Sequence, residues 1–397
     1  MQSTHNFLLP DYLTSFSCKM GECRTPCCVG WPVHISLNDY FHLTSQECSD
    51  ELRRRMDTGV KVALHPTPEE YAQITPRYDG DCSMRMPDGR CILHAELGEE
   101  ALANVCRLYP RGIRLEPDYE CSLTNSCEGV LELLFEKEEP IRFSRQEISF
   151  GTLPPHKRSY TFPLMGKEIE IRLWLIAHIQ NRILPLSERL MSLGRSLQKL
   201  EQILDAQDPQ ALEALLQAPF PTDFLSLEAS PEHLSFGLRT MQELSRQLDE
   251  RSDSLRAYGE AAQAYFSVCC DSDNFAPSSG SFEHYLRAKE HFETTFPKWE
   301  IWFEHMLVNH MFFEQFPFQD RPESPWDEFV AISSLYALLR FLSLGCMADT
   351  DSVTDFIDMA AATFRLVGHT SFDHYVARIM KDLGCTTPQT IFDLISL

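Results

Sequence analysis

The chain is short of basic residues relative to acidic ones. It has 35 Lys and Arg residues against 58 Asp and Glu residues, which gives a formal net charge of −23. We therefore expect no nucleic-acid partner, because binding to that backbone depends on lysine and arginine side chains that neutralise phosphates. A surface that carries lysine side chains fits the acidic field better, although the same charge also serves solubility.

The chain also has no apolar run that approaches the ~20 residues needed to span a membrane. Before Pro10 there is no basic leader and only three consecutive apolar residues, so we do not expect a signal peptide. These absences predict a cytoplasmic protein without membrane insertion. Its cysteines are then expected to be reduced and available to metals rather than paired in disulfides.

Several motifs of cofactor chemistry are missing. The three-cysteine C-x3-C-x2-C loop of radical enzymes does not occur, so a radical mechanism has no support from motif. No Gly-x-Gly-x-Gly loop follows a predicted strand, which argues against a Rossmann-like nucleotide cradle. No repeat with a period of 20 to 50 residues is apparent, so we do not predict a solenoid.

Cysteine, in contrast, is abundant and unevenly distributed. Ten of the 14 cysteines lie in the first 130 residues, and the densest group is Cys18, Cys23, Cys27 and Cys28. Four thiolates so close in the chain can converge on one metal centre with short turns between them. The alternative is a zinc or disulfide framework that only holds a loop-rich domain together, since closed thiolate sites often contain zinc.

Further cysteines continue this pattern down to residue 127. Cys48 and Cys121 fall outside the recurring groups, which leaves as predicted metal ligands Cys18, Cys23, Cys27, Cys28, Cys82, Cys91, Cys106 and Cys127. Eight thiols exceed one tetrahedral site. They suit one four-cysteine cluster plus a zinc ion, two clusters, or one cluster plus spare structural thiols. His94 and His34 lie close enough in sequence to join such a site, but each is also an ordinary surface or core histidine.

The pattern of turns and apolar residues predicts three regions. Residues 1–140 are rich in turn formers and are expected to form a cysteine-rich domain of loops and short helices ordered by its metal. Residues 141–165 alternate around a turn at 151–155 and predict a short strand pair that joins two units. Residues 166–397 show helical periodicity with breaks at Pro185, 206–209, 218–221, 271–280 and 317–325. The fold class predicted is therefore mainly α, with a C-terminal helical bundle.

The cysteine order resembles that of a known family. The segments that carry the resemblance are 18–31, the Cys82 and Cys91 pair, Cys106-Arg-Leu-Tyr-Pro-Arg111, Glu120-Cys-Ser-Leu-Thr-Asn-Ser-Cys127 and the aromatic segment Phe303–Phe318. In this order they resemble the flagellin lysine-N-methyltransferases, iron–sulfur proteins of a wider cysteine-cluster family. The resemblance spans most of the chain.

This resemblance implies an enzyme that transfers methyl groups from S-adenosylmethionine to flagellin lysines. It also implies an iron–sulfur cluster, expected to be 4Fe-4S, bound by the N-terminal cysteines, with zinc as the alternative metal. The reaction needs a group that orients the neutral lysine amine, and the candidates near the cysteine motifs are Tyr109, Glu120 and Asp118. We predict Tyr109 and Glu120 as catalytic residues. The alternative for each candidate is an ordinary hydrogen-bonding role beside Arg107, Arg111 or Arg114.

Two further interpretations remain open at this stage. The aromatic stripe of Phe303–Phe318 is interpreted as helix core, and its alternative use is to wall a cavity for S-adenosylmethionine or the lysine stem. The four C-terminal cysteines are interpreted as incidental core thiols: Cys269, Cys270, Cys346 and Cys385.

The alternative to the methyltransferase function is a non-catalytic iron–sulfur or zinc protein that serves redox chemistry or metal handling.

Overall fold

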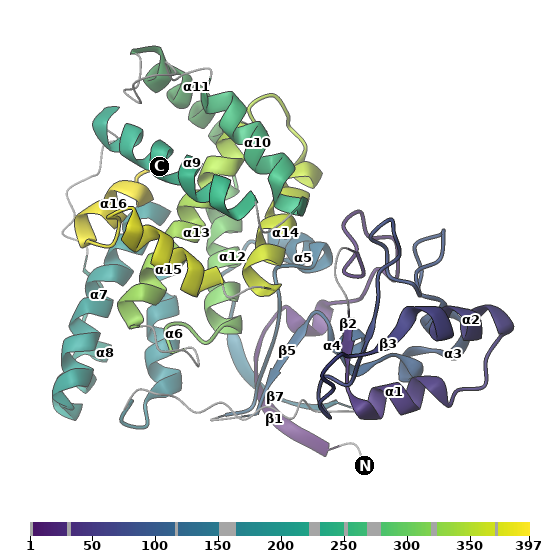
Figure 1. The fold of residues 1–397 in the computed structure, drawn as a ribbon. Helices are drawn as coiled ribbons and strands as arrows, with labels where there is room; N and C mark the ends of the chain where they lie inside the picture. The colour runs from purple at the N-terminus through teal and green to yellow at the C-terminus, as the bar shows by residue number, and fades with distance from the viewer. Residues whose placement is uncertain are drawn as a thin grey trace.

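A computed structural model describes residues 3–29, 33–115, 118–150, 164–221, 231–249, 253–267, 279–318, 324–369 and 372–397. The protein has a large helical lobe and a smaller lobe from the N-terminal part of the chain, which lie side by side (Figure 1). Helices dominate the described residues, which confirms the prediction of a mainly α fold.

The smaller lobe consists of short elements around a three-stranded sheet. They are β2 (Val33–Ile35), α1 (Leu37–Thr44), α2 (Asp50–Gly59), β3 (Val60–Val62), β4 (Ala72–Ile74), α3 (Ile92–Leu97), η2 (Glu99–Ala101) and α4 (Asn104–Leu108). The central strand β4 pairs antiparallel with both neighbours, so that Val33 and Val60 lie opposite Ile74 on its two sides. Such short strands bury little apolar surface on their own, and the lobe depends on packing between its loops and helices.

The smaller lobe has an apolar core of its own. Its buried members are Val33, Ile35, Leu43, Leu52, Met56, Ala72, Ile74, Cys82, Met84, Ile92, Leu93 and Ala103. Two serines fix the helices that cover this core: the hydroxyl oxygens of Ser36 and Ser49 accept hydrogen bonds from amides in the first turns of α1 and α2. These caps satisfy amides that have no partner within their helices.

A four-stranded mixed sheet lies between the two lobes (Figure 1). Its order is β5–β6–β1–β7, with β1 at Ser3–Pro10, β5 at Arg111–Arg114, β6 at Glu120–Leu123 and β7 at Phe143–Phe150. Strand β1 runs parallel to β6 and antiparallel to the whole of β7. The predicted strand at 141–150 is thus present, but its described partner is β1. The predicted partner at 160–162 lies outside the described residues.

The larger lobe is a bundle of helices. These are α5 (Glu128–Glu136), α6 (Glu168–Ile179), α7 (Leu186–Ala206), α8 (Pro209–Gln217), α9 (Pro231–Asp249), α10 (Asp253–Ser267), α11 (Ser279–Thr295), α12 (Trp299–Phe313), α13 (Pro325–Cys346), α14 (Val353–His369), α15 (Phe372–Asp382) and α16 (Pro388–Ile395). Predicted breaks coincide with helix starts, where Pro185, Asp208 and Ser324 are the N-caps of α7, α8 and α13. The predicted break at 271–280 lies mostly outside the described residues.

Helix α13 is the centre of the bundle and packs against α7, α9, α10, α14, α15 and α16. Among the described residues it is the one helix long and apolar enough to cross a membrane, and 94% of its apolar window is buried inside the protein. Its apolar surface is therefore covered by the surrounding helices, as expected for a core helix.

The core of the larger lobe includes part of the N-terminal region. Phe7 and Leu9 of β1, together with Leu131 and Leu134 of α5, belong to the same apolar cluster as the C-terminal helices. The side-chain amide of Asn309 on α12 also donates to the carbonyl of Leu123 at 2.7 Å. The separate core thus covers only residues 33–103, and not the whole of the predicted 1–140 domain. The reason is that β1, β6 and α5 bury their apolar faces against helices far away in sequence.

Candidate functional site

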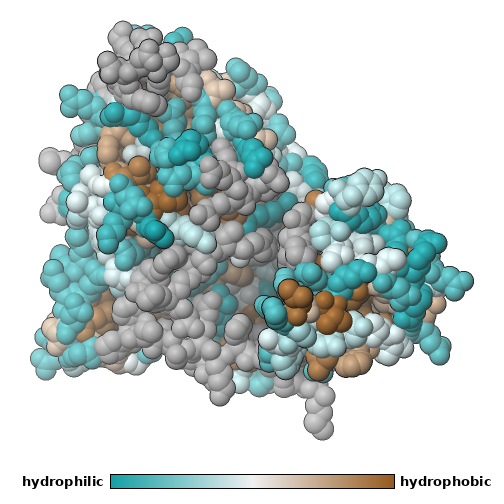
Figure 2. Space-filling view, viewed as in Figure 1, coloured by the Kyte–Doolittle hydropathy of each residue, from teal (hydrophilic) through white to brown (hydrophobic). Residues whose placement is uncertain are grey.

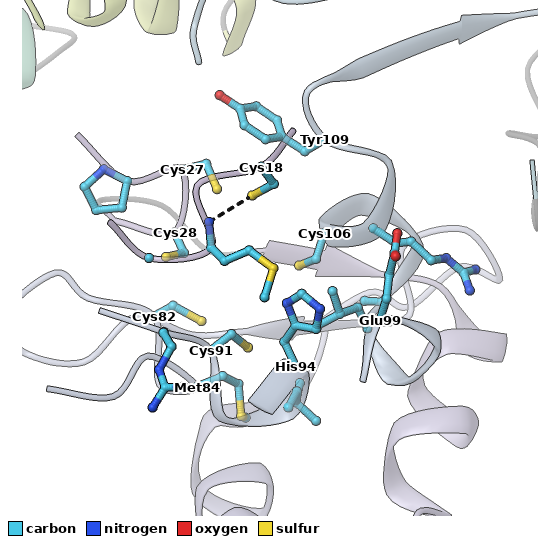
Figure 3. A pocket seen from close by; sticks show the side chains of 18 of the residues that line it. Cys18, Cys27, Cys28, Cys82, Met84, Cys91, His94, Glu99, Cys106 and Tyr109 are labelled. Carbon is cyan, nitrogen blue, oxygen red and sulfur yellow. Dashed lines mark hydrogen bonds between the residues drawn. The ribbon is translucent and has the colours of Figure 1, made fainter. Parts of the chain in front are cut away.

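The thiols predicted as ligands surround a pocket in the smaller lobe, with a volume of about 440 Å³. Seven of the eight line it: Cys18, Cys23, Cys27, Cys28, Cys82, Cys91 and Cys106. Figure 3 shows Cys18 and Cys27 on the side of the pocket nearest Tyr109, with Cys82 and Cys91 on the opposite side. The tertiary structure therefore brings together cysteines that are separated by up to 88 residues in the chain.

Backbone hydrogen bonds position one part of this set. The amide of Cys82 donates to the carbonyl of Cys28 at 2.9 Å, and the amide of Arg85 donates to the carbonyl of Cys82 at 2.9 Å. The chain then turns back, so that Cys91 pairs with Arg85 in an isolated bridge. Cys91 is the N-cap of α3, and Cys106 enters from α4. Four short segments thus converge on one side of the pocket.

The eighth thiol, Cys127, is the N-cap of α5 and lies close to the loop that carries Cys18 to Cys28. The carboxylate of the next residue, Glu128, accepts hydrogen bonds from the backbone amides of Arg24 at 3.2 Å and Thr25 at 2.7 Å. The ammonium group of Lys19 donates to the same carboxylate at 2.9 Å. Burial alone would raise the pKa of Glu128, but these donors outweigh it and lower that pKa to about 2.

Burial also governs the thiols themselves. It raises the pKa of Cys23 and of Cys82 to about 11, so both are protonated at neutral pH in the metal-free protein. The adjacent pair Cys27 and Cys28 is different: a hydrogen bond between the two sulfurs lowers the pKa of Cys28 to about 7 and raises that of Cys27. A metal bound here would displace protons from most of the thiols that hold it.

The pocket can hold a soft metal by its donor chemistry, because seven thiols converge on it from separate segments. Within the described residues, however, no three Cys, His, Asp or Glu side chains are already arranged as the ligands of one ion. Metal ligation by this set is therefore treated below as a proposal.

The two predicted catalytic residues lie in different surroundings. Tyr109 lines the pocket, and its hydroxyl is 3.1 Å from the hydroxyl of Ser126. Burial raises the pKa of Tyr109 well above its usual value, so the phenol is neutral. Glu120 is 3% exposed, and a guanidinium nitrogen of Arg172 lies 2.6 Å from its carboxylate. It is not among the residues that line the pocket.

Sequence reasoning gave no site role to two charged residues that line the pocket. Glu99, in η2, supplies the one carboxylate among the described lining residues, and Arg111, at the start of β5, supplies a guanidinium group next to the ring of Phe16. Arg111 ends the run Cys106-Arg-Leu-Tyr-Pro-Arg111, but no spacing in the sequence indicates Glu99. His94 lines the pocket as well, whereas His34 is an exposed residue of β2 and does not.

The described lining is largely apolar around these groups. It includes Met20 and Val105, which are 50% and 37% exposed. Figure 2 shows hydrophobic side chains gathered on the visible face of the smaller lobe among hydrophilic ones. A concave apolar site with a few polar groups is the usual form of a small-molecule site.

Comparison with known proteins identifies the family. A family model described as the FliB lysine N-methylase C-terminal domain matches residues 172–394, which is more than half of the chain. The chain belongs to the FliB lysine N-methylase family. No curated protein and no solved structure matches the chain. The reaction class that membership indicates is N-methylation of lysine.

The region matched by the FliB family begins after the last predicted metal ligand, yet it holds the cysteine loop in place. The guanidinium group of Arg24 donates two hydrogen bonds to Asp358 on α14, at 3.0 and 3.1 Å. Arg365 of the same helix donates to the carbonyls of Thr25 and Ser126. The FliB C-terminal domain thus buttresses the wall of the pocket that carries Cys18, Cys23 and Cys27.

Other residues singled out in the sequence lie elsewhere. None of the aromatic residues of Phe303–Phe318 lines the described pocket; Phe303, Phe312 and Phe318 are buried in the core, as the first interpretation held. Cys346 and Cys385 pack against the same core, and Cys121 is fully buried in β6. Cys269 and Cys270 lie outside the described residues.

Proposed function

We propose that this FliB-family chain is a cytoplasmic methyltransferase that moves a methyl group from S-adenosylmethionine to lysine side chains of flagellin. The observation that carries the proposal is the pocket lined by seven cysteines, which the matched C-terminal domain braces through Arg24 and Thr25. Family membership supports the lysine substrate, and the resemblance of the cysteine motifs supports flagellin.

The reaction places definite demands on the pocket. The lone pair of a neutral lysine nitrogen attacks the methyl carbon of the sulfonium, the carbon–sulfur bond breaks, and its electrons remain on sulfur as a neutral thioether. A proton must also leave the nitrogen, because a free lysine amine has a pKa of about 10.4 and is charged at neutral pH. The site therefore needs an apolar channel for the lysine stem and a proton acceptor at its end.

Glu99 and Tyr109 are suited to these tasks. We assign Glu99 as the acceptor of the lysine proton, since it is the carboxylate among the described lining residues. Tyr109 is neutral and hydrogen-bonded to Ser126, so it orients the amine rather than removing its proton. Arg111 offers a cationic partner for the carboxylate of the methionine part of the cosubstrate. Glu120 remains a prediction, and its buried pairing with Arg172 favours a structural role.

The eight thiols also suit an iron–sulfur cluster. Zinc is the alternative metal. The residues that would hold either group are Cys18, Cys23, Cys27, Cys28, Cys82, Cys91, Cys106 and Cys127. The cluster would supply soft, thiolate-bound iron for redox or Lewis-acid chemistry. The polypeptide around it positions Tyr109 through Ser126 and holds the cysteine loop through Glu128.

A second candidate function is metal handling or electron transfer without methyl transfer. The specific observation in its favour is that thiols dominate the polar groups of the pocket, whereas proton-transfer groups are few. The two candidates differ in one measurable way, because only the methyltransferase changes the mass of a lysine.

The test uses protein purified without oxygen, S-adenosylmethionine and the cognate flagellin monomer. Mass spectrometry is expected to show lysine residues heavier by whole methyl groups, with S-adenosylhomocysteine formed in equal amount. If steering by the acidic surface matters, initial rates fall as salt rises. Metal-replete protein that leaves flagellin unmodified would defeat the methyltransferase proposal and favour the metal-handling alternative.

A further inference from the structure

The larger lobe contacts Tyr109 through a short buried segment and not through the pocket wall. The described lining residues lie between positions 16 and 111, so none of them belongs to the range 172–394 that the FliB family model matches. The segment is residues 124–126, which follow β6 and precede the N-cap of α5. The exposed fractions of its three residues are 9%, 3% and 0%. Polar side chains buried to this degree need hydrogen-bond partners inside the protein.

Three hydroxyl groups form a chain from the pocket into this segment. The hydroxyl of Tyr109 lies 3.1 Å from that of Ser126, and the hydroxyl of Ser126 lies 3.1 Å from that of Thr124. The amide of Ser126 also donates to Thr124 Oγ1 at 3.3 Å, so this oxygen already acts as an acceptor. The amide of Thr124 donates to the carbonyl of Pro110 at 2.9 Å, which fixes the segment beside Tyr109.

Helices α12 and α14 hold the segment in place. The side-chain amide of Asn125 donates to the carbonyl of Met306 at 2.8 Å, and the side-chain amide of Asn309 donates to the side-chain oxygen of Asn125 at 2.6 Å. The guanidinium group of Arg365 donates to the carbonyl of Ser126 at 3.4 Å. Because α12 and α14 lie in the matched range, the FliB C-terminal domain determines where the hydroxyl chain ends.

The acidity of the three groups favours one direction of hydrogen bonding along the chain. A phenol has a pKa of about 10 and is far more acidic than the hydroxyl of serine or threonine, so it is the strongest donor of the three. The favoured direction therefore runs from Tyr109 to Ser126 and from Ser126 to Thr124. In this direction the phenol proton is engaged inside the protein, and the lone pairs of the phenol oxygen remain available to a group bound in the pocket.

This direction suits methyl transfer to an amine. The nitrogen lone pair must attack the methyl carbon, so an O–H group that donates to this nitrogen would compete with the attack. A phenol oxygen whose proton is engaged elsewhere accepts a hydrogen bond from the amine N–H and leaves the lone pair free. We propose that Thr124 and Ser126 are positioning residues, which hold the phenol proton of Tyr109 away from the attacking amine. This proposal rests on the proposed methyltransferase function and deepens it.

The first test compares initial rates on flagellin in two backgrounds. Thr124→Val breaks the chain at a residue that does not line the described pocket. In otherwise wild-type protein it should lower kcat about 10-fold and leave the KM for flagellin within about twofold, because the orientation of the amine changes and its binding does not. In Tyr109→Phe, which has no phenol proton to hold, the same substitution should change kcat by less than about twofold. Ser126→Ala should show the same dependence on background.

Two more variants separate positioning from stability. Thr124→Ser keeps the hydroxyl and should recover most of the loss in kcat. Thr363→Val is the matched control, because it removes a buried hydroxyl of α14 that donates to the carbonyl of Met359; it should leave kcat unchanged. An equal fall in kcat for Thr124→Val in both backgrounds would show a merely structural role and overturn the proposal.

A second measurement needs neither flagellin nor S-adenosylmethionine. With 3-fluorotyrosine at position 109 of the full-length protein, the fluorine NMR signal reports the hydrogen bond of the neighbouring phenol. Ser126→Ala and Thr124→Val should both shift this signal, whereas Thr363→Val should not. A signal that Ser126→Ala leaves in place would overturn the proposal. Wild-type protein that transfers no methyl group would count against the proposed function, while the expected shifts would still support the hydroxyl chain, so the two failures are distinguishable.

Discussion

The carboxylate of Glu128 accepts hydrogen bonds from both the amide and the hydroxyl of Thr25, at 2.7 and 2.8 Å. The two residues are 103 positions apart, yet this contact fastens the cysteine loop to the helix that begins after Cys127. Glu128 is 1% exposed, so a weakened contact cannot be replaced by water without opening the site.

We expect Glu128→Gln to loosen this connection. The amide keeps the shape of the side chain but loses its charge, and hydrogen bonds to a charged group are worth about 1.5–3 kcal/mol each. The free energy of unfolding should fall by about 1–3 kcal/mol, and metal should dissociate faster from the thiols of the loop. Glu132→Gln is the control on the same helix, because it contacts Lys19 and Arg24 but not Thr25. Equal effects of the two variants on metal release would contradict the role given to Glu128.

A second prediction concerns the close approach of Gly21 and Gly89. Gly21 has φ +110°, and a Cβ there would lie 2.7 Å from the backbone of Gly89. Gly21→Ala should therefore separate the cysteine loop from the turn between Cys82 and Cys91. We expect lower metal content and a lower melting temperature, whereas Gly80→Ala, with a similar φ and open space around it, should show the backbone strain alone. Metal content that is unchanged in Gly21→Ala would refute this reading.

A third prediction separates catalysis from structure. Tyr109→Phe and Glu99→Gln should each lower kcat by about 10²-fold, since one loses the group that orients the amine and the other the proton acceptor. Neither should reduce metal content. Glu120→Gln should instead destabilise the protein by breaking its buried pair with Arg172, with little change in kcat of the folded fraction. A lower kcat for Glu120→Gln, together with an unchanged kcat for Tyr109→Phe and Glu99→Gln, would contradict the catalytic roles given to Tyr109 and Glu99.

Metal removal should act on the smaller lobe first. Its separate core is small and covers residues 33–103, so we expect a metal at the proposed site to contribute a large share of its order. Limited proteolysis of chelated protein should cut within this range while the helices that pack around α13 stay resistant. Cleavage confined to 166–397 would contradict the prediction.

The last prediction is a pH dependence that arises far from the pocket. His178 is buried against Trp174 and Phe220, and neither ring nitrogen has a hydrogen-bond partner among the described residues. Burial lowers the pKa of His178 from 6.5 to about 3. Between these values the unfolded chain binds a proton that the folded chain does not, so stability falls as pH falls below 6.5.

The variant His178→Phe removes this proton linkage. Relative to the wild type, it should gain up to about 2 kcal/mol of unfolding free energy when the pH is lowered from about 7.5 to about 5, as measured by denaturant unfolding. His42 is an exposed residue of α1, and His42→Phe serves as a control that keeps His178 in place. A wild-type stability that does not change over this range would show that His178 is not a source of the linkage.

Much of this protein was predictable from local sequence. The helices around Leu190–Leu204 follow from a periodicity of three to four residues, and the starts at Pro209 and Pro325 follow from capping chemistry. The metal-ligand candidates follow from residue type and density, because thiols gathered in one region are typical of soft-metal sites. These features depend on neighbours within a few turns of chain, and their physical causes are local.

Only the tertiary structure decided which of these residues meet. Three features depend on contacts between distant segments: the pairing of β1 with both β6 and β7, the burial of Glu120 by Arg172, and the convergence of Glu99 and seven cysteines on one pocket. Sequence spacing could not show which thiols share the pocket. Seven of the eight predicted ligands line it, whereas Cys127 caps α5 and is not among the described lining residues, because the packing of whole lobes positions the segments that carry these thiols.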